Sequence, residues 1–220
     1  MAAKKGLEVG IVGLGKFGSA LAERLVEMKV TVIGLDRSES RVGAMRDILE
    51  HVYHADATDK AALRQLGFGD LTHAVVSSGH SLEASVLATL NLKELGVPQV
   101  WCKAISEEHE KILRKLGADF VVFPEQYVAK QIAHHLAVPG LVHYFPLGSG
   151  VALQEVIVEK WAGSTLRDLN LTNRFHLQVV GIKRPDEKDY SYIPKADQVL
   201  NVGDMLLIIG AEDRLDRIES

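Results

Sequence analysis

Short apolar runs alternate with amphipathic segments over residues 7–136 of this 220-residue chain. The runs are rich in Val and Ile and lack strict apolar–polar alternation, which is typical of strands buried on both faces. They predict six strands, at residues 7–13, 30–36, 51–56, 73–78, 99–104 and 119–124. Between them, apolar residues recur at helical spacing at residues 16–29, 83–96 and 107–117. This alternation predicts a Rossmann-like, doubly wound parallel sheet.

The pattern changes after Leu136. Residues 136–150 carry Pro and Gly and are interpreted as a linker or hinge. The remainder predicts strands and one short helix capped by Ser164 or Thr165; the strands lie at residues 151–159, 177–184, 190–194 and, as a buried strand, 204–210. We therefore expect an α/β protein with a Rossmann-like nucleotide-binding domain at residues 1–136. A small, antiparallel α+β domain, hinge included, is expected at residues 137–220.

Composition removes several classes of function. The formal net charge of −4 gives no electrostatic reason to expect nucleic acid as a partner. No apolar stretch approaches the roughly 20 residues that a membrane span requires, and the first residues lack the apolar core of a signal peptide. The single cysteine, Cys102, excludes an intrachain disulfide and fits a reducing cytosol.

A glycine-rich loop follows the first predicted strand. Gly13, Gly15 and Gly18 match G-x-G-x-x-G, in which the glycines permit a tight turn, approach of a phosphate to the backbone and close helix packing. The helix that follows directs its N-terminal amides at the phosphates. Asp36 ends the next strand, where a carboxylate accepts ribose hydroxyls, although a solvated turn residue is the alternative. Arg37 would suit a 2′-phosphate, which Asp36 would repel.

Further candidates follow the other strands at the carboxyl edge of the predicted sheet, where ligands of such folds bind. Asp56 and Thr58 can border an adenosine pocket, although Thr58 or Asp59 can equally cap the next helix. The ends of the fourth and fifth strands contribute Ser77, Ser78, Gly79 and Lys103. Lys16 suits the charge of a triphosphate, or is simply solvated.

Two observations bear on catalysis and metal binding. The chain has no G-x-S-x-G elbow and no G-x-x-x-x-G-K-[ST] loop, and the His and Arg residues of its second half form no catalytic constellation. We therefore expect no catalytic residues. Glu125 opens a helix after the sixth strand, where it complements the helix dipole or binds a divalent cation at an interface.

Together these segments form a recognisable set. They are "IVGLGKFGSALAERL", Asp36, "HADAT", "VVSSGHSLEASVLATLNLKELG", "VWCKA", "KLGADFVVFPE" and "YIPKADQVLNVGDMLLIIGAEDRL". The chain resembles, over essentially its whole length, the KtrA/TrkA-type RCK (KTN) regulatory subunits of bacterial potassium uptake systems. The resemblance implies a cytoplasmic regulator, without enzymatic activity, on the inner face of the membrane. It would form dimers that assemble into an octameric ring beneath an integral-membrane potassium-translocating subunit.

The resemblance also implies ligands and their residues. ATP and ADP would favour opposite states of the ring, and some relatives bind NAD or NADH instead. The nucleotide would contact the glycine loop, Asp36, the "DAT" segment and the later strand ends, a set comprising Gly13, Gly15, Lys16, Phe17, Gly18, Asp36, Arg37, Asp56, Ala57, Thr58, Ser78, Gly79 and Lys103. Glu125 matches a carboxylate that binds Mg²⁺ or Ca²⁺ between subunits.

One position departs from the family. Lys16 replaces an arginine that reaches a terminal phosphate, so the charge is retained and the bidentate fork is lost. The leading interpretation is a nucleotide-sensing subunit that gates potassium transport. The alternatives are a small NAD(P)-dependent oxidoreductase and an NAD(H)-sensing interaction module.

Overall fold

The computed structural model describes residues 6–77, 81–138 and 140–218. The chain divides into two compact units, Met1–Pro124 and Glu125–Ser220. The second unit therefore begins before the boundary expected after residue 136, and helix α6 (Pro124–Ala137) falls almost wholly within it. The reason is that this helix makes ion pairs with the second unit: Lys130 lies 2.7 Å from Glu212 and His134 lies 3.3 Å from Asp216.

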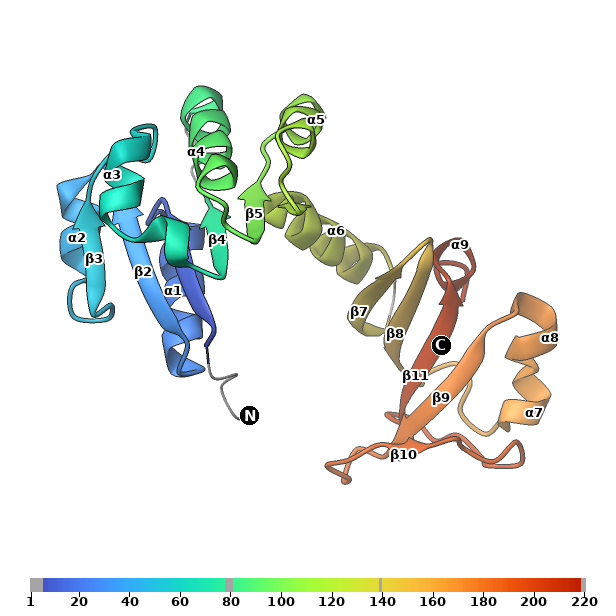
Figure 1. Ribbon diagram of the computed structural model, residues 1–220. Helices are drawn as coiled ribbons and strands as arrows, with labels where there is room; N and C mark the ends of the chain where they lie inside the picture. The colour runs from blue at the N-terminus through green and yellow to red at the C-terminus, as the bar shows by residue number, and fades with distance from the viewer. Residues whose placement is uncertain (1–5, 78–80, 139, 219–220) are drawn as a thin grey trace. The chain divides into compact units, whose positions relative to one another are not determined.

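The first unit is built on a six-stranded, wholly parallel sheet (Figure 1). Its spatial order is β3-β2-β1-β4-β5-β6, the doubly wound order of a Rossmann domain. All six predicted strands are present, as β1 (Glu8–Val12), β2 (Thr31–Asp36), β3 (His51–His54), β4 (His73–Val76), β5 (Gln99–Lys103) and β6 (Phe120–Val122). The predicted fold class of this unit is therefore confirmed.

Helices connect these strands. They are α1 (Lys16–Glu27), α2 (Glu39–Met45), α3 (Lys60–Gln65), the short 3₁₀ turn η1 (Phe68–Asp70), α4 (Leu82–Glu94) and α5 (Glu107–Lys115). Side chains cap several of their N-termini: Asp59 accepts hydrogen bonds from two amides of α3, and Ser106 accepts one from His109. Gly96 and Gly117 take positive φ angles of 85° and 93° just after α4 and α5, the left-handed conformation in which many helices end.

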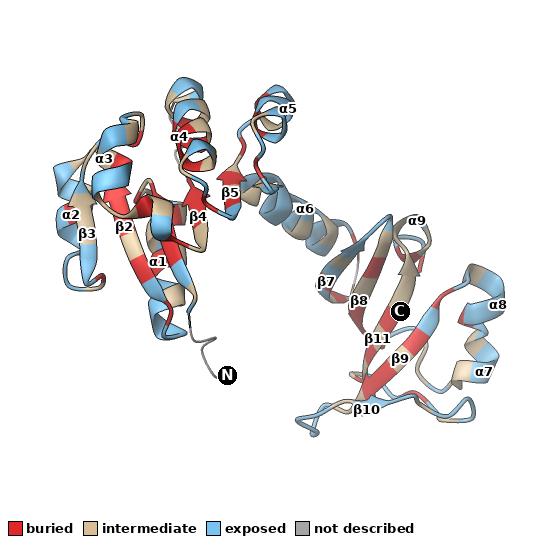
Figure 2. Cartoon of the chain, viewed as in Figure 1, coloured by how far each residue is buried: buried red, intermediate tan, exposed pale blue. Residues whose placement is uncertain are grey.

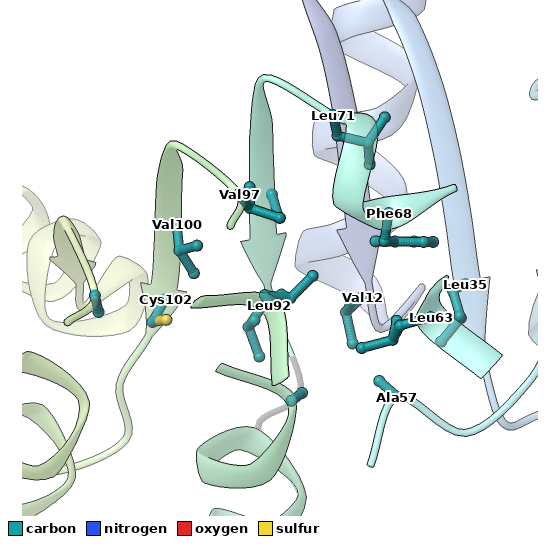
Figure 3. Close-up of a cluster of buried hydrophobic side chains, with 14 of the residues drawn as sticks. Val12, Leu35, Ala57, Leu63, Phe68, Leu71, Leu92, Val97, Val100 and Cys102 are labelled. Carbon is teal, nitrogen blue, oxygen red and sulfur yellow. The ribbon is translucent and has the colours of Figure 1, made fainter. Parts of the chain in front are cut away.

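Two apolar clusters cover the two faces of this sheet, because successive strand residues point to opposite sides. Val12 and Val76 pack on one face with residues of α3, α4 and α5, as Figure 3 shows in part. Ile11 and Val75 pack on the other face with residues of α1 and α2. The only cysteine, Cys102, belongs to the first cluster, and burial raises the pKa of its thiol to about 11. Cys102 is thus a small core residue.

The second unit contains a five-stranded antiparallel sheet in the order β10-β9-β11-β8-β7. Its elements are α6 (Pro124–Ala137), β7 (Leu141–Gly148), β8 (Val151–Ile157), α7 (Leu166–Leu169), α8 (Leu171–Phe175), β9 (Gln178–Lys183), β10 (Ser191–Tyr192), β11 (Met205–Ala211) and α9 (Glu212–Leu215). Thr165 caps α7 in a reciprocal capping box with Asp168. The small antiparallel α+β domain predicted from the sequence is confirmed.

The interpretation of residues 136–150 as a linker or hinge is wrong for most of that stretch. Residues 141–148 form β7, which pairs with β8. Within β7, Tyr144 is buried whereas His143 and Phe145 are exposed, which is the alternation of an edge strand with one covered face. The linker interpretation rested in part on Pro146, which lies within β7. An edge strand tolerates proline because one row of its N–H groups has no ladder partner.

A second correction concerns β11, which was expected to be fully buried. Leu206 and Ile208 are buried in the core of the unit, but Met205, Leu207 and Ile209 are only partly covered. β11 therefore has one face on the core. The turn before it is fixed by Asp204, which is fully buried, pairs with Arg184 and accepts the Asn201 amide at 2.8 Å.

Helix α6 has no buried residue, and most of its length is exposed (Figure 2). Three of its exposed apolar side chains are spaced four residues apart, so they lie on one side of the helix: Val128, Ile132 and Leu136. Among the described residues, no helix is both long enough and apolar enough to cross a membrane.

Candidate nucleotide-binding site

The glycine loop joins β1 to α1 in a fixed turn. Gly13 has a φ of 95°, a backbone conformation that is strained for any residue with a side chain. Its amide donates a hydrogen bond to the Leu35 carbonyl of β2 at 2.8 Å. Gly15 is the N-cap residue of α1, whose first residue is Lys16, with an exposed side chain. The loop therefore presents the N-terminus of a twelve-residue helix at the carboxyl edge of the sheet, where phosphates bind in such folds.

Gly18 permits the close approach of α1 to the loop. A Cβ atom at Gly18 would lie 1.9 Å from the Gly13 carbonyl oxygen and 2.6 Å from the Ser77 hydroxyl oxygen, and neither distance is possible in a folded protein. Ser77, at the exit of β4, donates its hydroxyl to that same carbonyl. The third glycine of the motif is thus required by packing.

Asp36 is buried and holds the loop from the side. Its Oδ2 accepts the Leu14 amide at 2.7 Å, and its Oδ1 accepts the Ser38 amide at 2.8 Å. The Arg41 guanidinium lies 3.4 Å from Oδ2. The alternative interpretation, in which Asp36 is a solvated turn residue, is therefore wrong. Two ionised oxygens have about four acceptor positions, so these three donors leave capacity for a ribose hydroxyl.

The "DAT" segment after β3 has a defined shape of its own. The exposed Asp56 carboxylate accepts the Thr58 amide and hydroxyl, both at 2.9 Å, and these bonds hold its pKa below the usual value. From α4, the buried Asn91 amide donates to the Ala57 and Thr58 carbonyls at 3.1 and 2.9 Å. Asp59, and not Thr58, caps α3. Asn91 was not predicted, although a buried polar residue on an apolar helix face could have indicated it.

Other predicted residues are placed as follows. Lys103, at the end of β5, has its ammonium 6.0 Å from the centre of the Phe17 ring in the first turn of α1. Arg37 is exposed, and its carbonyl accepts from His54 at the end of β3. Ser78 and Gly79 lie outside the described residues. The structure therefore brings the glycine loop, Asp36 and Lys103 to one edge of the sheet.

Glu125 belongs to the second unit of the chain. It lies exposed in the first turn of α6, at the start of the second unit. Across the parts of the chain that the structure describes, no three His, Cys, Asp or Glu side chains are gathered as a metal site.

These features define a class: a Rossmann-type nucleotide-binding domain followed by a small antiparallel domain. The TrkA-N domain family matches residues 9–124, and the TrkA-C domain family matches residues 153–220. The chain belongs to the family of potassium-uptake proteins that combine these two domains. Ktr system potassium uptake protein C of Bacillus subtilis is 37% identical over 96% of both chains. Ktr system potassium uptake protein A of Vibrio alginolyticus is 32% identical over 94% of both.

Solved structures show the same fold. The GsuK RCK domain is 26% identical, with a TM-score of 0.57, and is matched over 97% of this chain and 46% of its own. The NAD-bound GsuK channel is 25% identical with a TM-score of 0.55, over 98% of this chain and 38% of its own. ADP-bound GsuK is 30% identical with a TM-score of 0.52, over 61% of this chain and 35% of its own. This chain therefore spans less than half of the GsuK chains.

The packing at Gly18 makes a stability prediction. Gly18→Ala should lower the free energy of unfolding of the first unit by about 1–3 kcal/mol, since the added methyl group forces α1 away from the loop. Gly43→Ala is the matched control, because Gly43 also lies in a helix and has nothing within 4 Å of an added Cβ. That control should be neutral or stabilising by up to about 1 kcal/mol. Equal unfolding midpoints in urea for wild type and Gly18→Ala would contradict this packing.

Proposed function

We propose that this protein is a regulatory subunit that binds an adenine nucleotide and thereby gates a membrane potassium transporter. The observation that carries the proposal is the glycine loop fixed to Asp36 in a TrkA-N domain, in a chain that a Ktr relative matches over 96% of its length. The alternative ligand is NAD or NADH, which the NAD-bound GsuK channel favours, whereas ADP-bound GsuK favours the adenosine phosphates.

The proposed binding mode assigns one task to each part of the edge. The amides at the start of α1 and the loop glycines hold phosphate oxygens, because the helix dipole and unpaired N–H groups favour an anion there. Asp36 accepts a ribose hydroxyl through its remaining lone pairs. The "DAT" segment, held by Asn91, borders the adenosine, with Arg37 beside it. The residues proposed to contact the phosphates also include Lys103, Phe17, Ser78 and Gly79.

Gating requires that the ligand bind two states of the assembly unequally, since only differential affinity shifts an equilibrium. ATP and ADP differ by one phosphate group and its charge. Lys16, exposed at the first position of α1, is the proposed contact for that difference. Lys16 offers a point charge where an arginine would offer a planar pair of donors. Discrimination between ATP and ADP therefore depends on charge more than on geometry.

The ribose assignment can be tested at Asp36. Asp36→Asn removes the charge while nearly preserving shape, so it should weaken binding of ATP and ADP by about 2 kcal/mol, or about 30-fold, the scale of a charge-assisted hydrogen bond. Isothermal titration measures the two dissociation constants. Asp47→Asn, an exposed carboxylate after α2, is the control and should bind as wild type does. Wild-type affinity in Asp36→Asn would refute the assignment.

The proposed assembly is a homo-oligomer, with dimers forming an octameric ring on an integral-membrane potassium-translocating subunit. In this arrangement the protein is cytoplasmic and associates with the membrane through its partner. Support comes from α6: Tyr127, Val128, Ile132 and Leu136 are 55%, 52%, 54% and 81% exposed. A helix that leaves so many large apolar side chains uncovered gains stability by packing against another copy of the chain.

This assembly predicts a change of mass. Ile132→Asp places a charge in the apolar stripe of α6, so sedimentation velocity should show smaller species than wild type at equal concentration. Met28→Asp, at a 46% exposed apolar residue just after α1, is the control and should keep the wild-type mass. A monomeric wild type, or an Ile132→Asp variant with unchanged mass, would contradict the assignment of α6.

Glu125 is the proposed metal residue. Its carboxylate, in the first turn of α6, would share a Mg²⁺ or Ca²⁺ ion with oxygen ligands of another subunit, because hard divalent cations prefer oxygen ligands. One carboxylate is too few for such a site, so the remaining ligands would come from the assembly.

A further inference from the structure

An arginine that the G-x-G-x-x-G fingerprint does not include lies at the mouth of the candidate site. Arg41, in the first turn of α2, has its Nη1 atom 3.4 Å from Asp36 Oδ2. The same atom would lie 4.0 Å from a Cβ atom built on Gly15, so the guanidinium also stands over the phosphate loop. Arg41 therefore lies between the proposed ribose acceptor and the proposed phosphate-binding residues.

Its position follows from the packing of α2. Val42 and Met45 are 2% exposed and fix the helix on the first unit. Arg41 precedes Val42, and its side chain remains 41% exposed while the Asp36 side chain is only 4% exposed. The guanidinium thus covers the carboxylate on its solvent side and remains accessible to a ligand.

The contact with Asp36 is a loose one. Charge-assisted N–H···O bonds are about 2.7–2.9 Å long, and the Arg41 distance of 3.4 Å exceeds that range. The Leu14 and Ser38 amides, at 2.7 and 2.8 Å, supply the short bonds to the same carboxylate. Releasing Arg41 therefore leaves Asp36 hydrogen-bonded and costs little.

We propose that Arg41 is a nucleotide-binding residue that pairs with the first phosphate after the ribose. In this proposal a ribose hydroxyl replaces the Arg41 guanidinium at Asp36 Oδ2. The guanidinium then moves to the phosphate that lies over Gly15. This proposal rests on the proposed function. It assigns Arg41 to nucleoside 5′-phosphates as a class, because the first phosphate is common to mono-, di- and triphosphates and to dinucleotides.

Arg37 differs from Arg41 in this respect, although it is the next residue after Asp36. Its carbonyl accepts a hydrogen bond from His54 and its side chain is exposed. Within the described residues, Asp36 forms its ion pair with Arg41. The guanidinium that contacts the Asp36 carboxylate comes from five residues further along the chain, in the first turn of α2.

The test separates phosphate recognition from ribose recognition. Adenosine, AMP and ATP are competed against a fluorescent ATP analogue on wild type, Arg41→Gln and Arg41→Lys. Arg41→Gln should lose about tenfold in affinity for AMP and for ATP, and should change by less than about threefold for adenosine, which has no phosphate. Arg41→Lys keeps the charge and should recover part of the loss.

The control is Arg24→Gln, because Arg24 lies on α1 with a 71% exposed side chain paired only to Glu27 in the described structure. It should bind all three ligands as wild type does. Equal losses for adenosine and AMP in Arg41→Gln, tighter binding of all three ligands, or no change would each overturn the role of Arg41. Absence of binding by the wild-type protein would instead overturn the proposed function, and the two failures are thereby distinguished.

Discussion

The hydrogen bond from the Leu14 amide to Asp36 Oδ2, 2.7 Å long, ties the turn after β1 to the end of β2. Because both groups are buried, losing the Asp36 carboxylate would leave the Leu14 amide without this partner, at a cost of about 1–3 kcal/mol. The Gly13 amide makes a parallel link to the Leu35 carbonyl. Together these bonds fix the position of α1, and with it the amides that face a phosphate.

This arrangement has a functional consequence. Asp36 shapes the loop and is the proposed ribose acceptor, so a ligand that contacts its carboxylate would act on a group already coupled to the start of α1. Arg41 adds a partly exposed cation, 3.4 Å from the same carboxylate. In the proposed binding mode a nucleotide meets a prearranged loop and one partly exposed arginine, which suits a protein that binds and reports a ligand.

The sequence predicted the first unit well because its strands are short, apolar and separated by turn residues. The tight phosphate loop at residues 13–18 was predicted from the spacing of its glycines. A Cβ atom on Gly18 would lie 1.9 Å from the Gly13 carbonyl oxygen, which is the physical reason that glycine is needed there. Strand β7 was missed because Pro146 and the glycines around the strand indicate a loop, and only the sheet order shows that β7 is an edge. Helix α2 was missed because seven residues with a central Gly43 carry too little helical pattern. The role of Asn91 depends on hydrogen bonds to residues 33 and 34 positions away in the sequence. The role of Arg41 depends on its contact with Asp36 at the end of β2. Residue spacing in the sequence shows neither contact.

The central claim is that the site binds an adenine nucleotide and leaves it chemically unchanged. The most direct measurement follows the fate of the ligand: the purified protein is titrated calorimetrically with ATP, ADP, NAD and NADH in the presence of Mg²⁺, and the nucleotide is then recovered and quantified by chromatography. The account predicts saturable binding of at least one of these ligands and its full recovery unaltered. The absence of binding to all four, or steady conversion of NADH to NAD with consumption of a second substrate, would contradict it.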